Sequence, residues 1–265
     1  MTLEEKKAKG EGISIRHAKK YFQIEKKTLL VLKEINLEIE PGDIVSIIGG
    51  SGCGKSTLLR MIAGLDHPNE GSIWIGEREV EKPSVDVGVL FQESRLLPWE
   101  NVENNVMFGL PDRISRKEKA QAAKEYIKLV GLEGFEKALP GQLSGGMQKR
   151  TAIARTLINR PHILLLDEPF GALDAFTKMN LQEEVVKIWK REKMTTVLVT
   201  HDIDEAIFMG NKVIIMSEKP GVIKKIVNVD LPEPRKRTSY DFEQIRLEVY
   251  REFFGEDNLP EDYSI

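Results

Sequence analysis

Residues 49–57 read Gly-Gly-Ser-Gly-Cys-Gly-Lys-Ser-Thr, a combination of residue types that suits the binding of a phosphate chain. The spacing fits G-x-x-x-x-G-K-[ST], in which glycines let backbone N–H groups turn toward the phosphates without Cβ clashes. Lys55 supplies a point charge for the β- and γ-phosphates, and the Ser56 hydroxyl is a ligand for Mg²⁺. The expected phosphate-binding residues are Gly49, Gly50, Ser51, Gly52, Cys53, Gly54, Lys55, Ser56 and Thr57.

The residues on either side of this loop predict the elements that position it. Residues 44–48 are an apolar run with β-branched side chains, which is typical of a buried strand. Residues 58–62 continue with helix formers, and Gly64 is placed to end that helix. A helix that begins at the loop offers unsatisfied N–H groups and the positive end of its dipole to an anion. The alternative, a glycine-rich loop that binds nothing, is disfavoured because both flanking elements are present.

Two adjacent acids close a second apolar strand. Residues 163–166 form the strand, and Asp167 and Glu168 follow it. Neighbouring strand residues point to opposite sides, so one carboxylate is expected to face Mg²⁺ while the other faces an incoming water. Two acids at the end of a buried strand are costly unless they bind something. With a phosphate loop in the same chain, we interpret them as functional.

Ser144, Gly145 and Gly146 precede an apolar-periodic helix and form a second backbone-donor arrangement at a helix start. Such a position binds anions. The alternative is an ordinary serine N-cap followed by glycines, and local sequence alone favours that alternative.

Three further residues are weak signals when each is considered alone. Tyr21, beside Phe22, is an aromatic that could stack on a nucleobase, although a core or edge aromatic fits the spacing better. Gln92 follows the predicted strand 85–91 and is typical of polar surface. His201 ends another strand, where a structural histidine is the commoner case, and the following aspartate is placed to cap a helix.

The remaining pattern predicts an α/β fold with two additions. Short strands at 13–15, 35–40 and 71–76 indicate an antiparallel β subdomain around the first half of the nucleotide-binding core. Residues 115–130 are strongly helical, and no strand signal appears before residue 163, so an inserted helical subdomain is expected.

Strands alternate with helices after the acidic pair, which predicts a mainly parallel sheet with helices on both faces. The later strands are expected at 197–200, 213–216 and 222–229. The final segment carries the basic cluster Arg235, Lys236 and Arg237, followed by apolar residues at helical intervals. We interpret that last stretch as a helix docked on the body.

Composition limits the classes of protein that the chain could belong to. Its 265 residues allow one large domain or a domain with an inserted subdomain. A net charge of −3 argues against a nucleic-acid partner, and a single cysteine excludes an internal disulfide. The charged N-terminus has no apolar signal core, and no apolar stretch reaches the length of a membrane span. We therefore expect a cytoplasmic protein whose membrane role, if any, goes through a partner.

Taken together, these motifs resemble those of the ATP-binding subunit of ABC transporters over nearly the whole chain. The matching segments, in the family's order, are GGSGCGKST (49–57), Gln92, LSGGMQ (143–148), ILLLDEP (163–169), ALD (172–174) and His201. The resemblance implies a P-loop NTPase of RecA-like fold. The implied domains are a nucleotide-binding core with its β subdomain (1–92 and 161–228), a helical subdomain with the signature motif (93–160), and a C-terminal tail and helix (229–265).

The resemblance also implies a role for each motif residue. Tyr21 stacks on adenine, Lys55 bridges the β- and γ-phosphates, and Glu168 polarises the attacking water. Ser56 and Gln92 ligate Mg²⁺ with support from Asp167, and His201 contacts the γ-phosphate. Ser144, Gly145 and Gly146 belong to a γ-phosphate site completed by another subunit, and Asp174 links the two sites.

A separate argument supports a shared site. The chain has one phosphate loop but two helix starts suited to anions. The second makes sense if it faces the nucleotide of a second copy, so that two copies related by a two-fold axis enclose two ATP molecules. Closure then excludes water and completes the electrostatic clamp that phosphoryl transfer needs.

The leading hypothesis is therefore an ATPase at the cytoplasmic face of the membrane, which powers import through a separate integral permease. The loop text, the LLPW segment, LSGGM and the LPEPR tail resemble the nitrate/sulfonate/taurine importer branch, which implies an extracytoplasmic solute-binding protein in the complete system. Residues 93–108 are where we expect the permease to dock. A soluble ABC ATPase of DNA repair or translation is the alternative; a regulatory module without turnover and a small-molecule kinase fit less well.

Overall fold

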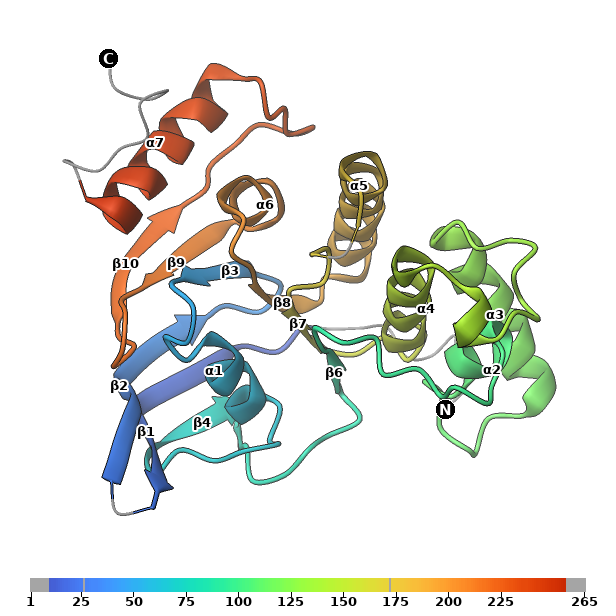
Figure 1. The fold of residues 1–265 in the computed structure, drawn as a ribbon, viewed down its shortest axis with the longest axis horizontal. Helices are drawn as coiled ribbons and strands as arrows, with labels where there is room; N and C mark the ends of the chain where they lie inside the picture. The colour runs from blue at the N-terminus through green and yellow to red at the C-terminus, as the bar shows by residue number, and fades with distance from the viewer. Residues whose placement is uncertain (1–9, 26, 172, 256–265) are drawn as a thin grey trace. The chain divides into compact units, whose positions relative to one another are not determined.

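A computed structural model describes residues 10–25, 27–171 and 173–255 of the chain. The charged N-terminus, Ala172 of the ALD motif and the last residues of the predicted C-terminal domain lie outside the described ranges. The described chain forms two compact units, whose elements are labelled in Figure 1. Within the described ranges, the signature unit consists of Gly10 and Val85–Met194, and the phosphate-loop unit consists of Glu11–Ser84 and residues 195–255.

The phosphate-loop unit contains two groups of strands. The antiparallel sheet has the order β2-β1-β4-β5, formed by β1 (Ile13–Ile24), β2 (Lys27–Ile39), β4 (Glu70–Ile75) and β5 (Arg78–Glu79). The second group has the order β10-β9-β3-β8, formed by β3 (Ile44–Gly49), β8 (Thr195–Val199), β9 (Lys212–Met216) and β10 (Ile223–Asn228). Strand β3 is buried along its whole length and runs parallel to β8 and β9, while β10 is antiparallel to β9. The predicted parallel core with an antiparallel β subdomain is confirmed.

Strand β1 is longer than the sequence suggested, because Tyr21 and Phe22 lie inside it rather than after it. It pairs with β2 on one side and β4 on the other, and its register shifts between Ile15 and Tyr21. His17 adopts a φ of 49° within this irregular stretch. Such bulges break the period-2 alternation of side chains, so the continuation of the strand was hidden from a pattern argument.

Helices α1 (Lys55–Ile62), α6 (Ile203–Met209) and α7 (Tyr240–Phe254) complete this unit. The C-terminal helix α7 docks as predicted: it packs on α6, β9 and β10 (Figure 1), and Phe242 and Val249 are fully buried. Arg246 makes a bidentate ion pair with Asp204 of α6, at 2.6 and 3.1 Å. Charge-assisted pairs of this geometry are among the stronger polar contacts.

The basic cluster of the tail is used to hold α6. Arg235 donates to the carbonyls of Ile207, Phe208 and Gly210, and so satisfies the C-terminal end of that helix. The Arg237 guanidinium lies 3.5 Å from the centre of the Phe208 ring. Two of the three basic side chains are thus explained by packing against α6.

The signature unit is built on β6 (Val87–Leu90) and β7 (Ile163–Asp167), which are parallel. Between them the chain forms the predicted helical insertion, and α5 follows β7. The helices are α2 (Val102–Met107), α3 (Arg116–Leu129), the 3₁₀ turn η1 (Pro140–Gln142), α4 (Gly145–Leu157) and α5 (Ala175–Glu192). Helices α2, α3 and α4 pack on one another (Figure 1). None of the helices in the described ranges is long and apolar enough to cross a bilayer.

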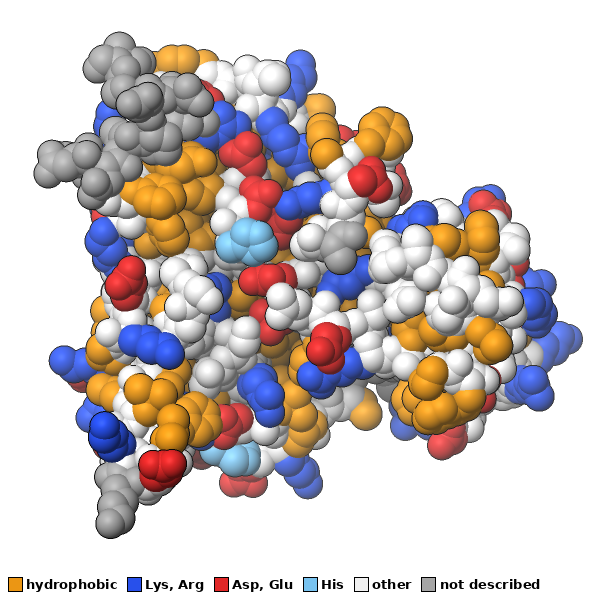
Figure 2. Space-filling model, viewed as in Figure 1, with side chains coloured by type: hydrophobic (Ala, Val, Ile, Leu, Met, Phe, Trp, Pro, Cys, Tyr) orange, Lys and Arg blue, Asp and Glu red, His pale blue; other side chains and the backbone are white. Residues whose placement is uncertain are grey.

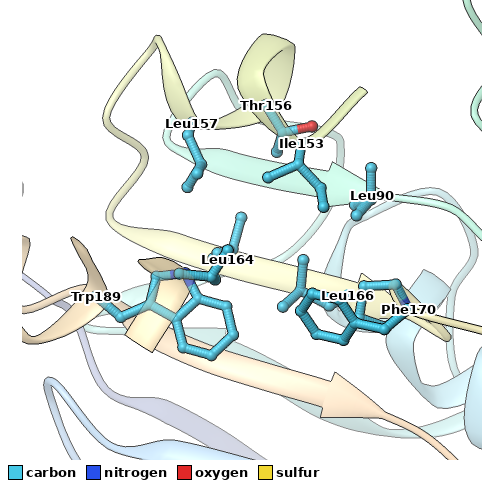
Figure 3. A pocket seen from close by; sticks show the side chains of 10 residues that line it. Leu90, Ile153, Thr156, Leu157, Leu164, Leu166, Phe170 and Trp189 are labelled. Carbon is cyan, nitrogen blue, oxygen red and sulfur yellow. The ribbon is translucent and has the colours of Figure 1, made fainter. Parts of the chain in front are cut away.

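An apolar interior fixes α4 over this pair of strands. Figure 3 shows Ile153, Thr156 and Leu157 of α4 facing Leu164 and Leu166 of β7, around a narrow cavity whose lining residues are all apolar except Thr156. Trp189 of α5 closes one end and is almost fully buried. Because packed interiors deform little, the start of α4 is held at a fixed position relative to the end of β7.

Candidate functional site

The phosphate loop joins the end of β3 to the start of α1. Gly52 and Gly54 have φ angles of 74° and 103°, a region that disfavours residues with a Cβ. At Gly54 a Cβ would also lie 2.6 Å from Leu32 Cδ2 of β2. No side chain caps α1, so the N-terminal N–H groups of this helix are available to an anion.

The Lys55 side chain folds back onto the first residues of the phosphate loop. The side chain is buried, and Nζ donates to the carbonyls of Gly49 at 2.8 Å and Gly50 at 3.0 Å. Cys53 is also buried, and a Cβ on Gly49 would lie 2.7 Å from its Sγ. The cysteine side chain therefore packs within the loop, whereas Ser56 is exposed. The arrangement of uncapped N–H groups around a lysine suits a polyphosphate.

The turn after β9 lies against this loop, which sequence reasoning missed. A Cβ on Gly221 would lie 2.0 Å from the Cys53 carbonyl, and one on Gly52 would lie 3.3 Å from Lys219 Nζ. A second lysine is therefore placed beside the phosphate loop. No local signal could have found it, because a proline-glycine turn after a strand indicates only a reversal of the chain.

Tyr21 and His201 belong to the same unit as the phosphate loop. Tyr21 is half-buried in β1, opposite Leu30 of β2, two residues before the Leu32 that meets Gly54. His201 follows β8 and is exposed. Asp202 caps α6 by accepting from Glu205 N at 2.9 Å, as predicted. The β subdomain thus meets the phosphate loop on its Tyr21-bearing side.

Glu168 lies just after β7 in the signature unit. Gln92 Nε2 donates to its Oε2 at 3.0 Å, so the structure pairs two residues that sequence reasoning chose separately. The argument that Asp167 and Glu168 alternate as strand residues is wrong, because β7 ends at Asp167 and Glu168 has a φ of 45°. Holding a glutamate in that conformation costs about 1–3 kcal/mol.

Lys149 of α4 contacts the backbone of this segment, and sequence reasoning did not identify it. It is 2 % exposed, and Nζ donates to the carbonyls of Phe91 at 2.8 Å and Gln92 at 2.7 Å. Burial lowers the pKa of Lys149 to about 8, although the charges of Asp167 and Glu168 oppose this shift. A signal was present in the sequence, since a lysine at the start of a buried helical stripe is unusual.

The signature residues lie at an exposed helix start. Ser144 is the N-cap of α4 and accepts from Met147 N at 3.3 Å, so the capping alternative describes its side chain correctly. Ser144 and Gly145 are both exposed, and a Cβ on Gly145 would meet nothing within 4 Å. The capping contact leaves this surface open to a ligand. Asp174 likewise caps α5 through Thr177 N, and this hydrogen bond lowers the pKa of Asp174.

Whether the predicted ligands suit Mg²⁺ depends on the chemistry of their side chains. Among the described residues, no group of three or more His, Cys, Asp or Glu side chains could hold a metal. Mg²⁺ is usually bound through one or two protein oxygens together with substrate phosphates. The Ser56 hydroxyl in the phosphate-loop unit, and the Gln92 amide and Asp167 carboxylate in the signature unit, are each hard oxygen donors of the kind that Mg²⁺ prefers.

The structure therefore gathers the predicted residues in two groups. The first, in the phosphate-loop unit, contains the loop, Tyr21 and His201. The second, in the signature unit, contains Gln92, Ser144–Gly146, Asp167, Glu168 and Asp174. Their individual roles stay predictions.

The chain is similar to known proteins in sequence and in structure. A family model described as ABC transporter matches residues 32–171. The aliphatic sulfonates import ATP-binding protein SsuB of Bacillus cereus is 50 % identical over 241 residues, covering 91 % of this chain and 95 % of that protein. The SsuB protein of Bacillus subtilis is 47 % identical over 248 residues, covering 94 % and 96 %.

A solved structure resembles the fold. It is the dimeric, post-hydrolysis state of the ATP-binding cassette MJ0796 bound to ADP and Pi. The match has a TM-score of 0.75 and 34 % identity, and covers 82 % of this chain and 99 % of that one.

Proposed function

Because the chain belongs to the ABC transporter family, as an ATP-hydrolysing subunit, we propose that it powers the import of sulfonates or related small anions through a separate membrane permease. The observation that carries this proposal is the 47–50 % identity to sulfonate import proteins along nearly their whole length. Nothing among these relatives favours the alternative of a soluble ATPase in DNA repair or translation.

The two groups of residues support a division of labour in ATP hydrolysis. The phosphate loop and Lys55 bind the phosphates, with Tyr21 stacking on the adenine and His201 contacting the γ-phosphate. Glu168 orients and polarises the attacking water, held by its hydrogen bond from Gln92. Ser56, Gln92 and Asp167 would hold Mg²⁺, which neutralises charge on the phosphates when bound.

A second copy of the chain is proposed to complete each site. This proposal is supported by the start of α4, where Ser144 and Gly145 are exposed. The phosphate loop of the chain belongs to the other unit. Phe176 and Met179, on the first turns of α5 beside Asp174, are large apolar side chains that are also exposed. The MJ0796 cassette, which has the same fold, was solved as a dimer. Hydrolysis would remove the phosphate that both copies bind and so allow them to separate.

The domain division predicted from the sequence differs from the two units, since it places Gln92, Asp167, Glu168 and Asp174 in the nucleotide-binding core, and it stays a proposal. Residues 1–92 and 161–228 would hold the nucleotide, 93–160 would present the signature motif, and 229–265 would brace the core. The proposal also places the chain at the cytoplasmic face of the membrane, where it would act with permease subunits and a solute-binding protein.

Transport activity tests this function directly. The chain is reconstituted in vesicles with its permease and solute-binding protein. We expect it to hydrolyse ATP faster when an alkanesulfonate is present. A duplex or tRNA added instead should cause no stimulation. Sulfonate-independent turnover together with tight, salt-dependent nucleic-acid binding would favour the DNA-repair or translation alternative.

The permease is proposed to dock in a groove of the signature unit that has a mixed lining. Its apolar lining residues include Leu97, Trp99, Met107, Phe108 and Leu110, and its polar ones are Glu100, Asn104, Asp112, Arg116 and Lys119. Trp99 is 72 % and Phe108 66 % exposed, and Figure 2 shows hydrophobic side chains gathered over this helical region. Asn105 is fully buried and supports the rim, since it donates to the carbonyls of Leu97, Glu100 and Asn101.

Trp99→Ala should weaken assembly with the permease while leaving nucleotide binding intact. Exposed aromatics that become buried in an interface typically contribute about 2 kcal/mol or more, or roughly thirtyfold in affinity. Co-purification of the tagged chain with the permease measures the loss. Phe135→Ala is the control, because Phe135 is exposed in the same unit but lies outside the groove. Equal recovery of permease with both variants would contradict docking at this groove.

A further inference from the structure

Helix α4 carries one buried ammonium group on its core-facing side. Lys149 shares that side with Ala152, Ile153 and Leu157, all of which are buried. Its Nζ lies 2.8 Å from the Phe91 carbonyl and 2.7 Å from the Gln92 carbonyl, just after β6 ends at Leu90. The lysine therefore ties α4 to the backbone of the residue that contacts Glu168.

Packing alone does not explain a lysine at this position. A buried ammonium loses its hydration, and two neutral carbonyls only partly replace it. A leucine or methionine would fill the same stripe without that cost. Asp167 and Glu168 supply negative charge that opposes the loss of the Lys149 proton. The site thus contains a cation, two loop carbonyls and the acidic pair, all within the signature unit.

The next residue provides a natural comparison. Arg150 also donates to two consecutive carbonyls, those of Val130 and Gly131, both at 3.1 Å. These carbonyls lie at the end of α3, inside the helical insertion. These two adjacent cations on α4 therefore hold different chain segments, and Lys149 is the one that contacts the backbone at Gln92. Farther along α4, Arg155 donates to the carbonyls of Ser94 and Arg95, which follow Gln92 in the same segment.

We propose that Lys149 is a positioning residue for ATP hydrolysis, which fixes the backbone at Gln92 to the signature helix so that the Gln92 amide stays directed at Glu168. The inference rests on the proposed roles of Gln92 and Glu168. Ser144 begins the same helix, five positions before Lys149. A shift of α4 on engagement of a second copy's nucleotide therefore moves the Gln92 carbonyl with it. Lys149 gives the signature motif a direct mechanical connection to the water-activating pair.

Three variants of the full chain test this role. Lys149→Met keeps most of the volume and removes the donors, so we expect kcat to fall by about tenfold or more, because small misplacements of reacting groups have large effects. KM for ATP should stay within about twofold, since the phosphate loop is unchanged, and the Mg²⁺ concentration for half-maximal rate should rise. Lys149→Arg should recover part of kcat. Arg150→Met should lower the melting temperature without changing kcat or the Mg²⁺ requirement.

The outcomes separate this inference from the proposed function. If the wild-type chain hydrolyses ATP and Glu168→Gln does not, the assignment of the water-activating pair stands. A Lys149→Met kcat within about twofold of wild type would then overturn the inference alone. If Lys149→Met and Arg150→Met have the same melting temperature and lose kcat to the same extent, the loss is a purely structural effect, and this result would also overturn the inference. If Lys149→Met does not fold, Lys149→Leu, which also removes the donors and fills the apolar stripe, is assayed in the same way under the same criteria.

Discussion

Glu168→Gln is expected to bind ATP normally, to hydrolyse it about 10²–10⁴-fold more slowly, and to accumulate as an ATP-bound dimer. The glutamine has the same shape and can still accept the hydrogen bond that Gln92 Nε2 donates at 3.0 Å. It fits the backbone at φ 45° as well as glutamate does. What it lacks is the negative charge that polarises the attacking water. The γ-phosphate therefore stays on the bound ATP, and the dimer that it stabilises persists.

Two measurements check this expectation on the same sample. Phosphate release in a single turnover reports the chemical step, and light scattering with and without ATP reports the dimer. Glu184→Gln is the matched control, because it makes the same chemical change at an exposed position on α5. A Glu168→Gln variant that stays monomeric with ATP at high protein concentration would count against the shared site. One that hydrolyses at the wild-type rate would remove Glu168 from the mechanism.

The parts of the site that sequence predicted well are those determined locally. Gly54 must be glycine because its φ is 103°, so the sequence of the loop alone indicates this backbone geometry. The cap of α4 at Ser144 and that of α6 at Asp202 are likewise set within four residues. Such features need no tertiary information, and the loop motif was recognisable for that reason.

Features that depend on distant contacts were predicted less well. The left-handed backbone of Glu168 has no local signal, since glutamate does not favour it and only the surrounding structure maintains it. Lys219 reaches Gly52 only because β9 lies beside β3, a pairing between residues far apart in the chain. Lys149 is intermediate: its place in a buried stripe could be read from the sequence, but its partners at Phe91 and Gln92 could not.

Two damaged copies should restore activity when mixed, if each ATP is bound by one copy's phosphate loop and the other's signature motif. Lys55→Ala removes the cation under the phosphates and should weaken binding of a fluorescent ATP analogue. Gly145→Asp leaves the fold intact, because a side chain at Gly145 meets nothing within 4 Å and an acid suits a helix start. The aspartate instead repels the phosphate of the facing copy. Each variant alone should be nearly inactive.

A mixed dimer contains one intact pocket, built from the loop of the Gly145→Asp copy and the signature of the Lys55→Ala copy. With random pairing, half of the dimers are mixed and each has one of two pockets intact, so about a quarter of the wild-type sites return. The ATPase rate of the equimolar mixture, compared with the mean of the separate variants, measures this recovery.

The control is Lys55→Ala mixed with the double variant Lys55→Ala,Gly145→Asp, since no pairing of these copies makes an intact pocket. Recovery in neither mixture would mean either that both pockets must act together or that no pocket is shared. Wild type diluted with the doubly damaged copy decides between these, because only a shared pocket lets an inactive partner lower the rate of the intact copy.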